Sequence, residues 1–136
     1  MEATESIVER LPMRLRAGPG PMLQLSVECR YGPDEPYAVH MRFGRVSGTG
    51  DAVWVVSRDL LLAGLRGPSG AGDVHVRPGA DGDTLIGLGG ESGTAVLRVG
   101  TGVLAAFLAA AIALVPLGTE SGCIDWDACI SGLLSA

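Results

Sequence analysis

The chain has 136 residues, ten arginines, no lysine and a net charge of −5. This length suits one domain with a core and is too short for two ordinary domains, so we expect residues 1–136 to form one domain. The net negative charge argues against a protein that binds nucleic acid through a broad basic face, because such binding needs many cationic contacts to phosphates. The charge is also uneven, since residues 1–66 hold eight arginines and eight acidic residues, whereas residues 67–136 hold two and seven.

The cysteines and the N-terminal residues indicate the cellular compartment in which the protein is located. The chain has an odd number of cysteines, which are Cys29, Cys123 and Cys129. The last two lack the spacing of a zinc knuckle. Residues 1–9 are acidic and have no apolar core of the kind that a signal peptide needs. We therefore expect a cytoplasmic protein whose cysteines are reduced and buried.

Two alternating runs predict a first β-hairpin. Residues 7–16 end in the alternation LPMRLR, and residues 22–31 alternate again, so each run has one apolar and one polar face. Residues 17–21, AGPGP, are typical of the turn between two strands. Pro12 lacks a backbone N–H and therefore indicates an edge strand.

Two further runs extend this hairpin to four antiparallel strands. Residues 37–43, YAVHMRF, alternate with the apolar residues on one face. Residues 48–51 have the composition of a turn. Residues 53–56, VWVV, are β-branched and aromatic, which favours a buried strand. The first half of the chain is thus predicted to be a four-stranded meander.

A short helix is predicted directly after the fourth strand, over residues 58–65. Ser57 is a typical N-cap, and Asp59 places a carboxylate near the positive end of the helix dipole. Four leucines give the helix an apolar face. We expect Gly64 and Gly67 to end it, because glycine adopts left-handed dihedral angles without steric cost.

Three more strands are predicted after this helix. Residues 68–72, PSGAG, are expected to form a glycine loop, and residues 73–77 alternate as a strand that Pro78 ends. Residues 84–88 and 94–99 are the last two predicted strands, and the glycines that follow Ile86 indicate either a bulge or an early end.

Two C-terminal helices complete the prediction. The first opens at Thr101 or Gly102 and covers residues 103–115, which are apolar throughout. Its unbroken apolar run is shorter than the roughly 20 residues of a membrane-spanning helix, and no basic or aromatic anchor follows, so we favour a buried helix. Residues 125–134 are predicted to form a short final helix capped by Asp125.

The local motifs lack the residues that catalysis would need. Residues 67–73 have the glycine spacing of a phosphate-binding loop, but Asp73 stands in place of the lysine, and the loop follows a helix and enters a strand. His40 and His75 would need a third ligand to bind a metal, so we interpret them as solvated or paired side chains. No nucleophile, base and oxyanion site can be assembled, and we expect no enzymatic activity, cofactor or metal.

Several motifs in colinear order resemble the SsgA-like proteins of actinomycetes. Residues 53–65, VWVVSRDLLLAGL, and residues 66–78, RGPSGAGDVHVRP, are similar to that family's tryptophan-bearing strand, Arg-Asp-Leu-Leu helix and Pro-x-Gly-x-Gly-Asp-Val loop. Residues 34–40, DEPYAVH, resemble its Asp-Pro-Tyr-Ala-Val-His element. Residues 115–120, VPLGTE, and residues 124–127, IDWD, resemble its closing segment.

The residues and the resemblance together lead to one expectation. The residues indicate an α+β fold, with a strongly antiparallel sheet of about seven strands, a short helix after the fourth strand and two C-terminal helices. The resemblance implies a whirly-like fold that assembles as a homotrimer. It also implies a non-catalytic adaptor at division septa, which controls sporulation-specific cell division and septum placement by contacting FtsZ or other SsgA-like proteins.

Two features of the sequence identify candidate contact residues: the family motif, and a helix in which this chain departs from the family pattern. The motif is densest around the short helix and the glycine loop, where the candidates for partner binding are Arg58, Asp59, Arg66, Ser69 and Asp73. Family members carry charges in the first C-terminal helix where this chain has alanines, so we expect another subunit to cover the extra apolar face. The candidates for this oligomer contact are Ala106, Phe107, Ala110, Ala113 and Leu114.

A second function remains open at this point. A whirly-like sheet that exposes Arg14, Arg16, Arg30 and Arg42 would have the charges needed to bind single-stranded nucleic acid. The aromatic residues are too few for a stacking platform, and the net charge is unfavourable. Nucleic-acid binding is therefore the alternative hypothesis, and a membrane-spanning protein is the less favoured third.

Overall fold

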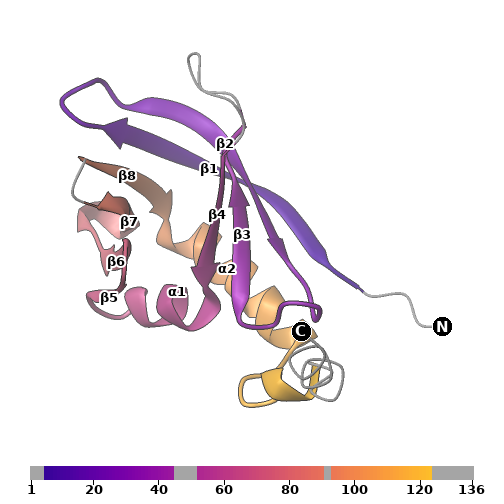
Figure 1. Ribbon diagram of the computed structural model, residues 1–136. Coiled ribbons are helices and arrows are strands. Elements are labelled where there is room, and N and C mark those ends of the chain that lie inside the picture. Colours follow the sequence, from indigo (N-terminus) through magenta and orange to yellow (C-terminus); the bar gives the residue numbers. More distant parts are fainter. Residues whose placement is uncertain (1–4, 45–51, 91–92, 124–136) are drawn as a thin grey trace, which may run out of the picture.

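The computed structural model describes residues 5–44, 52–90 and 93–123. Eight strands form one sheet with the order β4-β3-β2-β1-β8-β7-β6-β5, and every neighbouring pair is antiparallel (Figure 1). The strands are β1 (Ile7–Ala17), β2 (Leu23–Tyr31), β3 (Ala38–Arg42), β4 (Val53–Ser57), β5 (Ser69–Ala71), β6 (Val74–Pro78), β7 (Asp83–Gly90) and β8 (Gly93–Gly100). The helices are α1 (Arg58–Gly64) and α2 (Thr101–Leu114), with 3-10 turns η1 (Ala80–Gly82) and η2 (Glu120–Cys123). The fold is thus α+β, as predicted.

The sheet consists of two meanders, β1 to β4 and β5 to β8, which join where β1 pairs with β8. This seam is short, because β8 pairs only with residues 13–17 of β1. Pro12 lies one residue beyond the last pair of the seam, where β1 retains β2 as its neighbour. The prediction that Pro12 marks an edge strand is therefore wrong for the strand as a whole. Proline is tolerated in this central strand because its missing N–H falls where the second partner has ended.

The eighth strand lies within the predicted glycine loop. Residues 69–71 form β5, which pairs with β6 through a two-residue turn at Gly72 and Asp73. Gly72 has a φ of 58°, which suits the first central position of a tight hairpin turn. The sequence therefore predicted the turn but not the strand, because three small residues show no alternation of apolar and polar side chains.

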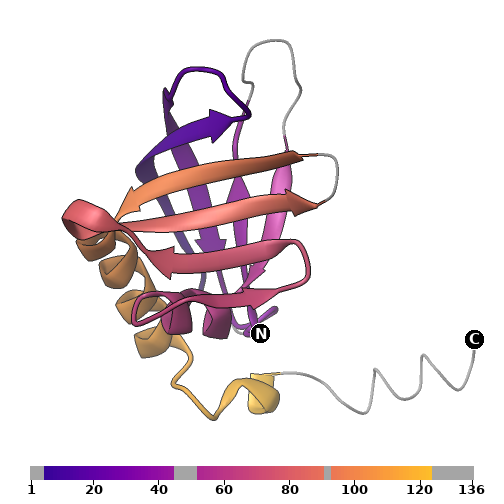
Figure 2. The same ribbon diagram turned by 90° about the vertical axis from the view of Figure 1, so that its left-hand side faces the viewer.

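The sheet curls, so that the two meanders face one another across the core (Figure 2). Most inward-facing side chains of the strands are apolar and buried, and the buried Thr84 on β7 is a polar exception. The apolar ones are Leu11, Met13, Val27, Cys29, Tyr31, Val39, Met41, Val56, Val74, Val76, Ile86, Leu88, Leu97 and Val99. Helix α1 links the two ends of the sheet and packs against β4, β5 and β6. Helix α2 contacts β1, β7, β8 and α1, and covers one end of the core.

Helix α1 begins as predicted but ends for a different reason. The Leu60 amide donates to Ser57 Oγ at 3.1 Å, which confirms Ser57 as the N-cap. Gly64 and Gly67 do not have positive φ angles, so the expected left-handed termination is wrong. Gly64 is instead buried against β6, where a β-carbon would overlap the side chain of Val76.

Helix α2 has 14 residues, and its buried residues are Leu104, Phe107, Leu108 and Ala111. Among the described residues, no helix has both the length and the apolar character that crossing a membrane would require. The predicted turn at 48–51 and the predicted final helix at 125–134 lie outside the described residues.

Candidate protein-contact surfaces

Arg58, a predicted partner-binding residue, is completely buried. It is the first residue of α1, and its guanidinium points away from solvent toward the C-terminal end of α2. Nη1 donates to the Tyr31 hydroxyl at 2.8 Å and to the backbone oxygens of Val115 at 2.7 Å and Ala111 at 3.2 Å. Nη2 donates to Glu120 Oε2 at 3.0 Å. Arg58 is therefore not a surface contact, because it is buried and both terminal nitrogens of its guanidinium are hydrogen-bonded inside the protein.

This buried cluster fixes four segments of the chain relative to one another. The carbonyl groups at the end of a helix lack partners within the helix, and Arg58 supplies a donor for that of the C-cap residue Val115. It also donates to the Ala111 carbonyl, which already accepts the Val115 amide. The Tyr31 hydroxyl also donates to the backbone oxygen of Pro36 at 2.8 Å. Backbone amides, its own first, and the guanidinium hold the pKa of Glu120 below its usual range, although burial acts in the opposite direction. The cluster thus ties β2, α1, α2 and η2 together and has a structural role.

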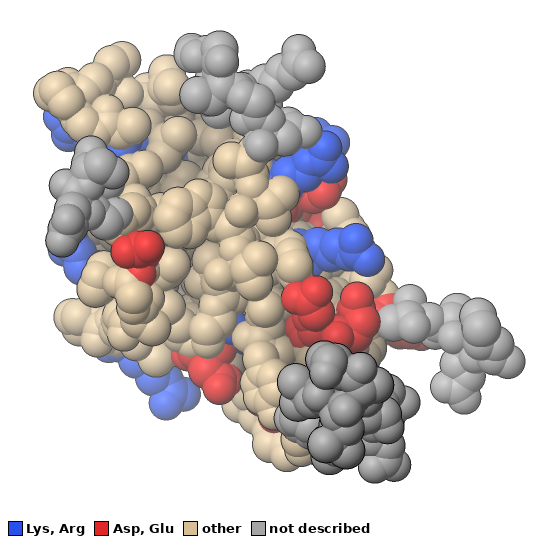
Figure 3. Space-filling model, viewed as in Figure 1, with Lys and Arg blue, Asp and Glu red and all other residues tan. Residues whose placement is uncertain are grey.

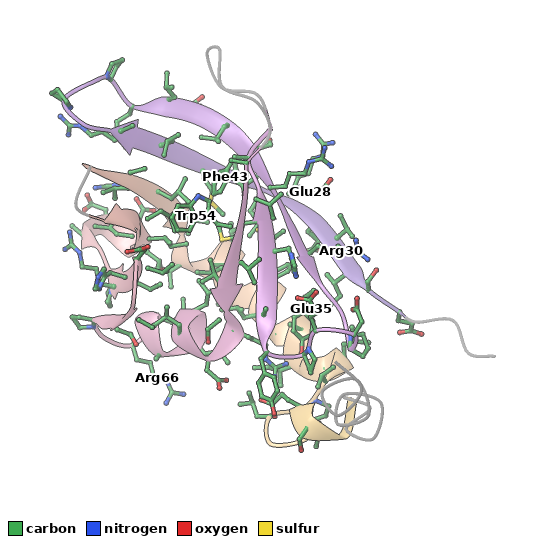
Figure 4. All side chains as sticks on the ribbon, viewed as in Figure 1. Glu28, Arg30, Glu35, Phe43, Trp54 and Arg66 are labelled. Carbon is green, nitrogen blue, oxygen red and sulfur yellow. The ribbon has the colours of Figure 1, made fainter. Side chains whose placement is uncertain are left out.

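The other predicted partner-binding residues lie at the surface of α1 and the β5–β6 hairpin. Asp59, Arg66 and Asp73 are exposed, and Ser69 is half-buried. Figure 4 shows Arg66 extending outward beyond the end of α1. Because α1 packs against β5 and β6, the structure brings these residues onto neighbouring elements.

The predicted oligomer-contact residues of α2 divide into two groups. Ala106 and Ala113 are exposed, and Ala110 and Leu114 are half-buried. Phe107 is fully buried and belongs to the core, so it is not available to another subunit. The sequence did not reveal this difference, because a helix that is apolar all round gives no periodic signal for its inner face.

A third surface, which the sequence did not predict, lies on the edge strand β4. This strand pairs only with β3, so its other edge has no partner strand among the described residues. Val53 and Val55 point outward, and 55% and 54% of their surfaces are exposed. Figure 3 shows that the region over β3 and β4 is mainly free of charge, with charged side chains toward its margins. The β-branched and aromatic composition of VWVV predicted a buried strand, and this prediction is wrong, because only Val56 of these four residues is buried and the strand order places β4 at an edge.

The two edges of the sheet differ in how they are protected. Natural edge strands avoid unwanted pairing by being short or by carrying charges, proline or a bulge. The β5 edge has three residues and follows Pro68. The β4 edge has five residues and carries no charge. An unprotected, apolar edge of this kind is typical of a strand that pairs with another polypeptide.

Charged side chains adjoin the β4 edge on the outer face of β2 and β3. His40 Nε2 lies 2.7 Å from Glu35 Oε2, so this histidine is a paired side chain, one of the two alternatives expected for it. Figure 4 shows Glu28, Arg30 and Glu35 on this side of the molecule. Within the described part of the chain, no group of three or more histidine, cysteine or acidic side chains is placed to bind a metal.

Comparison with known proteins places the chain in a family. A family model described as "Streptomyces sporulation and cell division protein, SsgA" matches residues 25–120. The chain belongs to the SsgA family. The sporulation-specific cell division protein SsgB of Kineococcus radiotolerans is 41% identical over 128 residues, which are 90% of this chain and 76% of that protein. SsgB of Streptomyces coelicolor is 37% identical over 129 residues, or 92% of this chain and 93% of that protein.

Solved structures of SsgA-family proteins have the same fold. A structure of SsgB, from work on mutations that correlate with longitudinal cell division during sporulation of Streptomyces coelicolor, superposes with a TM-score of 0.81. It is 32% identical, and the match covers 91% of this chain and 99% of that one. The SsgA-like sporulation-specific cell division protein of Thermobifida fusca superposes with a TM-score of 0.84 at 30% identity, over 97% of this chain and 98% of that chain. The resemblance seen in the sequence is therefore confirmed.

Proposed function

We propose that this SsgA-family protein is a non-catalytic adaptor in sporulation-specific cell division, where it acts in the cytoplasm at division septa. Family membership supports the process, since the relatives are sporulation-specific cell division proteins. The observation that carries the adaptor role is the β4 edge, which has no partner strand within residues 5–44, 52–90 and 93–123 and exposes the side chains of Val53 and Val55. Such a surface binds polypeptides and does not perform chemistry.

The β4 edge contacts its partner by strand addition. A partner strand laid along β4 pairs with its free backbone N–H and C=O groups, and these bonds supply affinity without a deep pocket. Burial of the exposed halves of Val53 and Val55 contributes on the order of 1–2 kcal/mol each. Asp59, Arg66 and Asp73 lie on the neighbouring α1 and β5–β6 hairpin and are proposed as polar contacts at the margin.

The partner is FtsZ or another SsgA-like protein. Purified FtsZ and a second family member are each immobilised, and binding of the wild-type protein is compared with that of two variants. Val55→Lys places a charge on the β4 edge and is expected to abolish binding. Val8→Lys is the matched control, because Val8 on β1 is 53% exposed, and it is expected to bind like the wild type. Equal binding by both variants, or none by the wild type to either protein, contradicts the proposal.

Self-association is assigned to a different surface, the outer face of α2. Ala106 and Ala113 are exposed there, and small side chains allow close approach of another subunit. We expect a homotrimer, measured by light scattering, that Ala106→Glu dissociates. Ala63→Glu on α1 changes an equally small exposed residue and should leave the trimer intact. A monomeric wild-type protein excludes this assembly.

A further inference from the structure

Two arginines face each other across the seam between the two meanders. Arg14 on β1 is directly opposite Arg98 on β8, and both side chains belong to the outer face of the sheet. Like charges in this position repel one another and destabilise the strand pair. The arrangement is unexpected in a protein with more acidic than basic residues.

The charges of this pair are only partly neutralised within the protein. Arg98 Nη1 lies 3.4 Å from Asp83 Oδ2, which is long for a charge-assisted hydrogen bond. Arg98 Nε is buried and has no hydrogen-bond partner in the described part of the chain. Arg14 is exposed and makes no ion pair with any described residue. The pair therefore retains donors and positive charge that a ligand can use.

The pair lies in an open groove of about 660 Å³. Gln24, on the strand beside β1, and Ser26 add hydrogen-bonding side chains to one wall. Val103, from the first turn of α2, is 40% exposed and adds an apolar contact at the other end. Arg16 continues the positive charge along the outer face of β1. The groove thus combines two cations and one carboxylate, Asp83, with neutral hydrogen-bonding side chains and apolar residues.

We propose that this groove binds an acidic, extended segment of a partner protein, with a carboxylate between Arg14 and Arg98. A carboxylate accepts paired hydrogen bonds from an arginine guanidinium, and one placed here removes the repulsion across the seam. The inference rests on the proposed adaptor function, because it names the chemistry of one partner segment. The groove is a different surface from the β4 edge.

The composition of the groove favours a peptide over single-stranded nucleic acid. Single strands are held by aromatic side chains on which bases stack, and no aromatic residue lines this groove. Tyr31 and Phe107 are buried, and the exposed Tyr37 is not part of the groove. Asp83 also places a negative charge in the groove, which repels phosphates along a strand. The composition of this groove therefore favours an acidic peptide over the nucleic acid of the alternative hypothesis.

The test measures binding of a fluorescein-labelled oligoglutamate peptide to the intact protein by fluorescence anisotropy at low salt. Oligoglutamine of equal length and labelled oligothymidylate are the comparison probes. We expect oligoglutamate to bind, oligoglutamine not to bind, and added salt to weaken the complex. Arg14→Gln should weaken binding about tenfold, since it removes a charge-assisted contact.

Two further variants separate a specific site from general attraction. Asp83→Asn removes the carboxylate that competes for Arg98 and should strengthen oligoglutamate binding. Arg30→Gln removes an exposed arginine on β2 that does not line the groove and should leave binding unchanged. Absence of binding at low salt, equal losses of oligoglutamate affinity in Arg14→Gln and Arg30→Gln, or tighter binding of oligothymidylate would each overturn the proposal. If oligoglutamate fails to bind while the β4 variants behave as expected, only this inference fails and the adaptor function stands.

Discussion

Nη2 of Arg58 donates to Oε2 of Glu120 over 3.0 Å, which joins the first residue of α1 to the first residue of η2. Both side chains are buried, with exposed fractions of 0% and 9%. Arg58 lies in the RDLL motif and Glu120 in the VPLGTE motif, two of the segments by which the chain resembles its family. The two motifs therefore share one structural role, because their contact holds the C-terminal end of α2 against the rest of the core.

Replacement of Arg58 is expected to be strongly destabilising. Arg58→Met removes the guanidinium that donates to the Tyr31 hydroxyl, the Val115 carbonyl and Glu120, and loss of one partner of a buried ion pair costs about 3–5 kcal/mol. Urea unfolding measures the change. Arg66→Met, on an exposed arginine just beyond the same helix, should stay within about 0.5 kcal/mol of the wild type. Similar losses of stability in the two variants would contradict the structural role of the buried Arg58 cluster.

The same contact predicts how stability depends on pH. Hydrogen bonds from backbone amides and from Arg58 lower the pKa of Glu120 from its usual 4.5 in the folded protein. As the pH falls below 4.5, the unfolded chain takes up this proton before the folded protein does, so the free energy of unfolding falls. The stabilisation is complete above this pH and is lost as the pH passes through the folded pKa.

Glu120→Gln tests this pH dependence, because glutamine does not titrate. Urea unfolding of both proteins through the acid range should show that the variant loses less stability than the wild type as the pH falls. If the free energy of unfolding fell equally with pH in the two proteins, Glu120 would not contribute to the pH dependence of stability.

Gly64 is expected to tolerate no side chain. Gly64→Ala places a β-carbon against Val76, which is fully buried and has no room to move, so overpacking should cost about 1–3 kcal/mol. Gly67→Ala is the matched control, because its β-carbon meets nothing within 4 Å. Thermal unfolding should therefore distinguish two glycines that lie three residues apart. A normal melting temperature for Gly64→Ala would contradict the close packing of α1 on β6.

Cys29 is expected to be unreactive in the folded protein. Burial, and then the charges of Glu9 and Glu28, raise the pKa of its thiol to about 12, so little thiolate forms at neutral pH. Iodoacetamide labelling followed by peptide mass spectrometry should find Cys29 unmodified in native protein and modified in urea. Equal labelling under both conditions would show that this part of β2 is open to solvent.

The alternation of side chains was enough to predict most of the sheet. Together with the β-branched and aromatic composition of residues 53–56, it located seven of the eight strands. It missed β5, whose small residues Ser69, Gly70 and Ala71 show no such alternation. The N-cap Ser57 was also correct, since capping depends on neighbouring residues and not on tertiary contacts.

The contact surfaces were harder to predict because they depend on long-range packing. A charge at the start of a helix is usually solvated, and only the position of Glu120, 62 residues later, makes burial of Arg58 favourable. Helix α2 is apolar on all sides, so the sequence did not separate buried Phe107 from exposed Ala106. The edge position of β4, which carries Val55, follows from the strand order, which single-strand patterns do not contain.

The adaptor function is tested most directly by locating fluorescent fusions in hyphae of a sporulating actinomycete. We expect ladders of bands between developing spores for the wild-type protein and for Val8→Lys, and diffuse fluorescence for Val55→Lys. Immunoblots must show equal amounts of the three fusions. A diffuse signal from the wild-type fusion, or normal ladders from Val55→Lys, would contradict an adaptor that acts through the β4 edge.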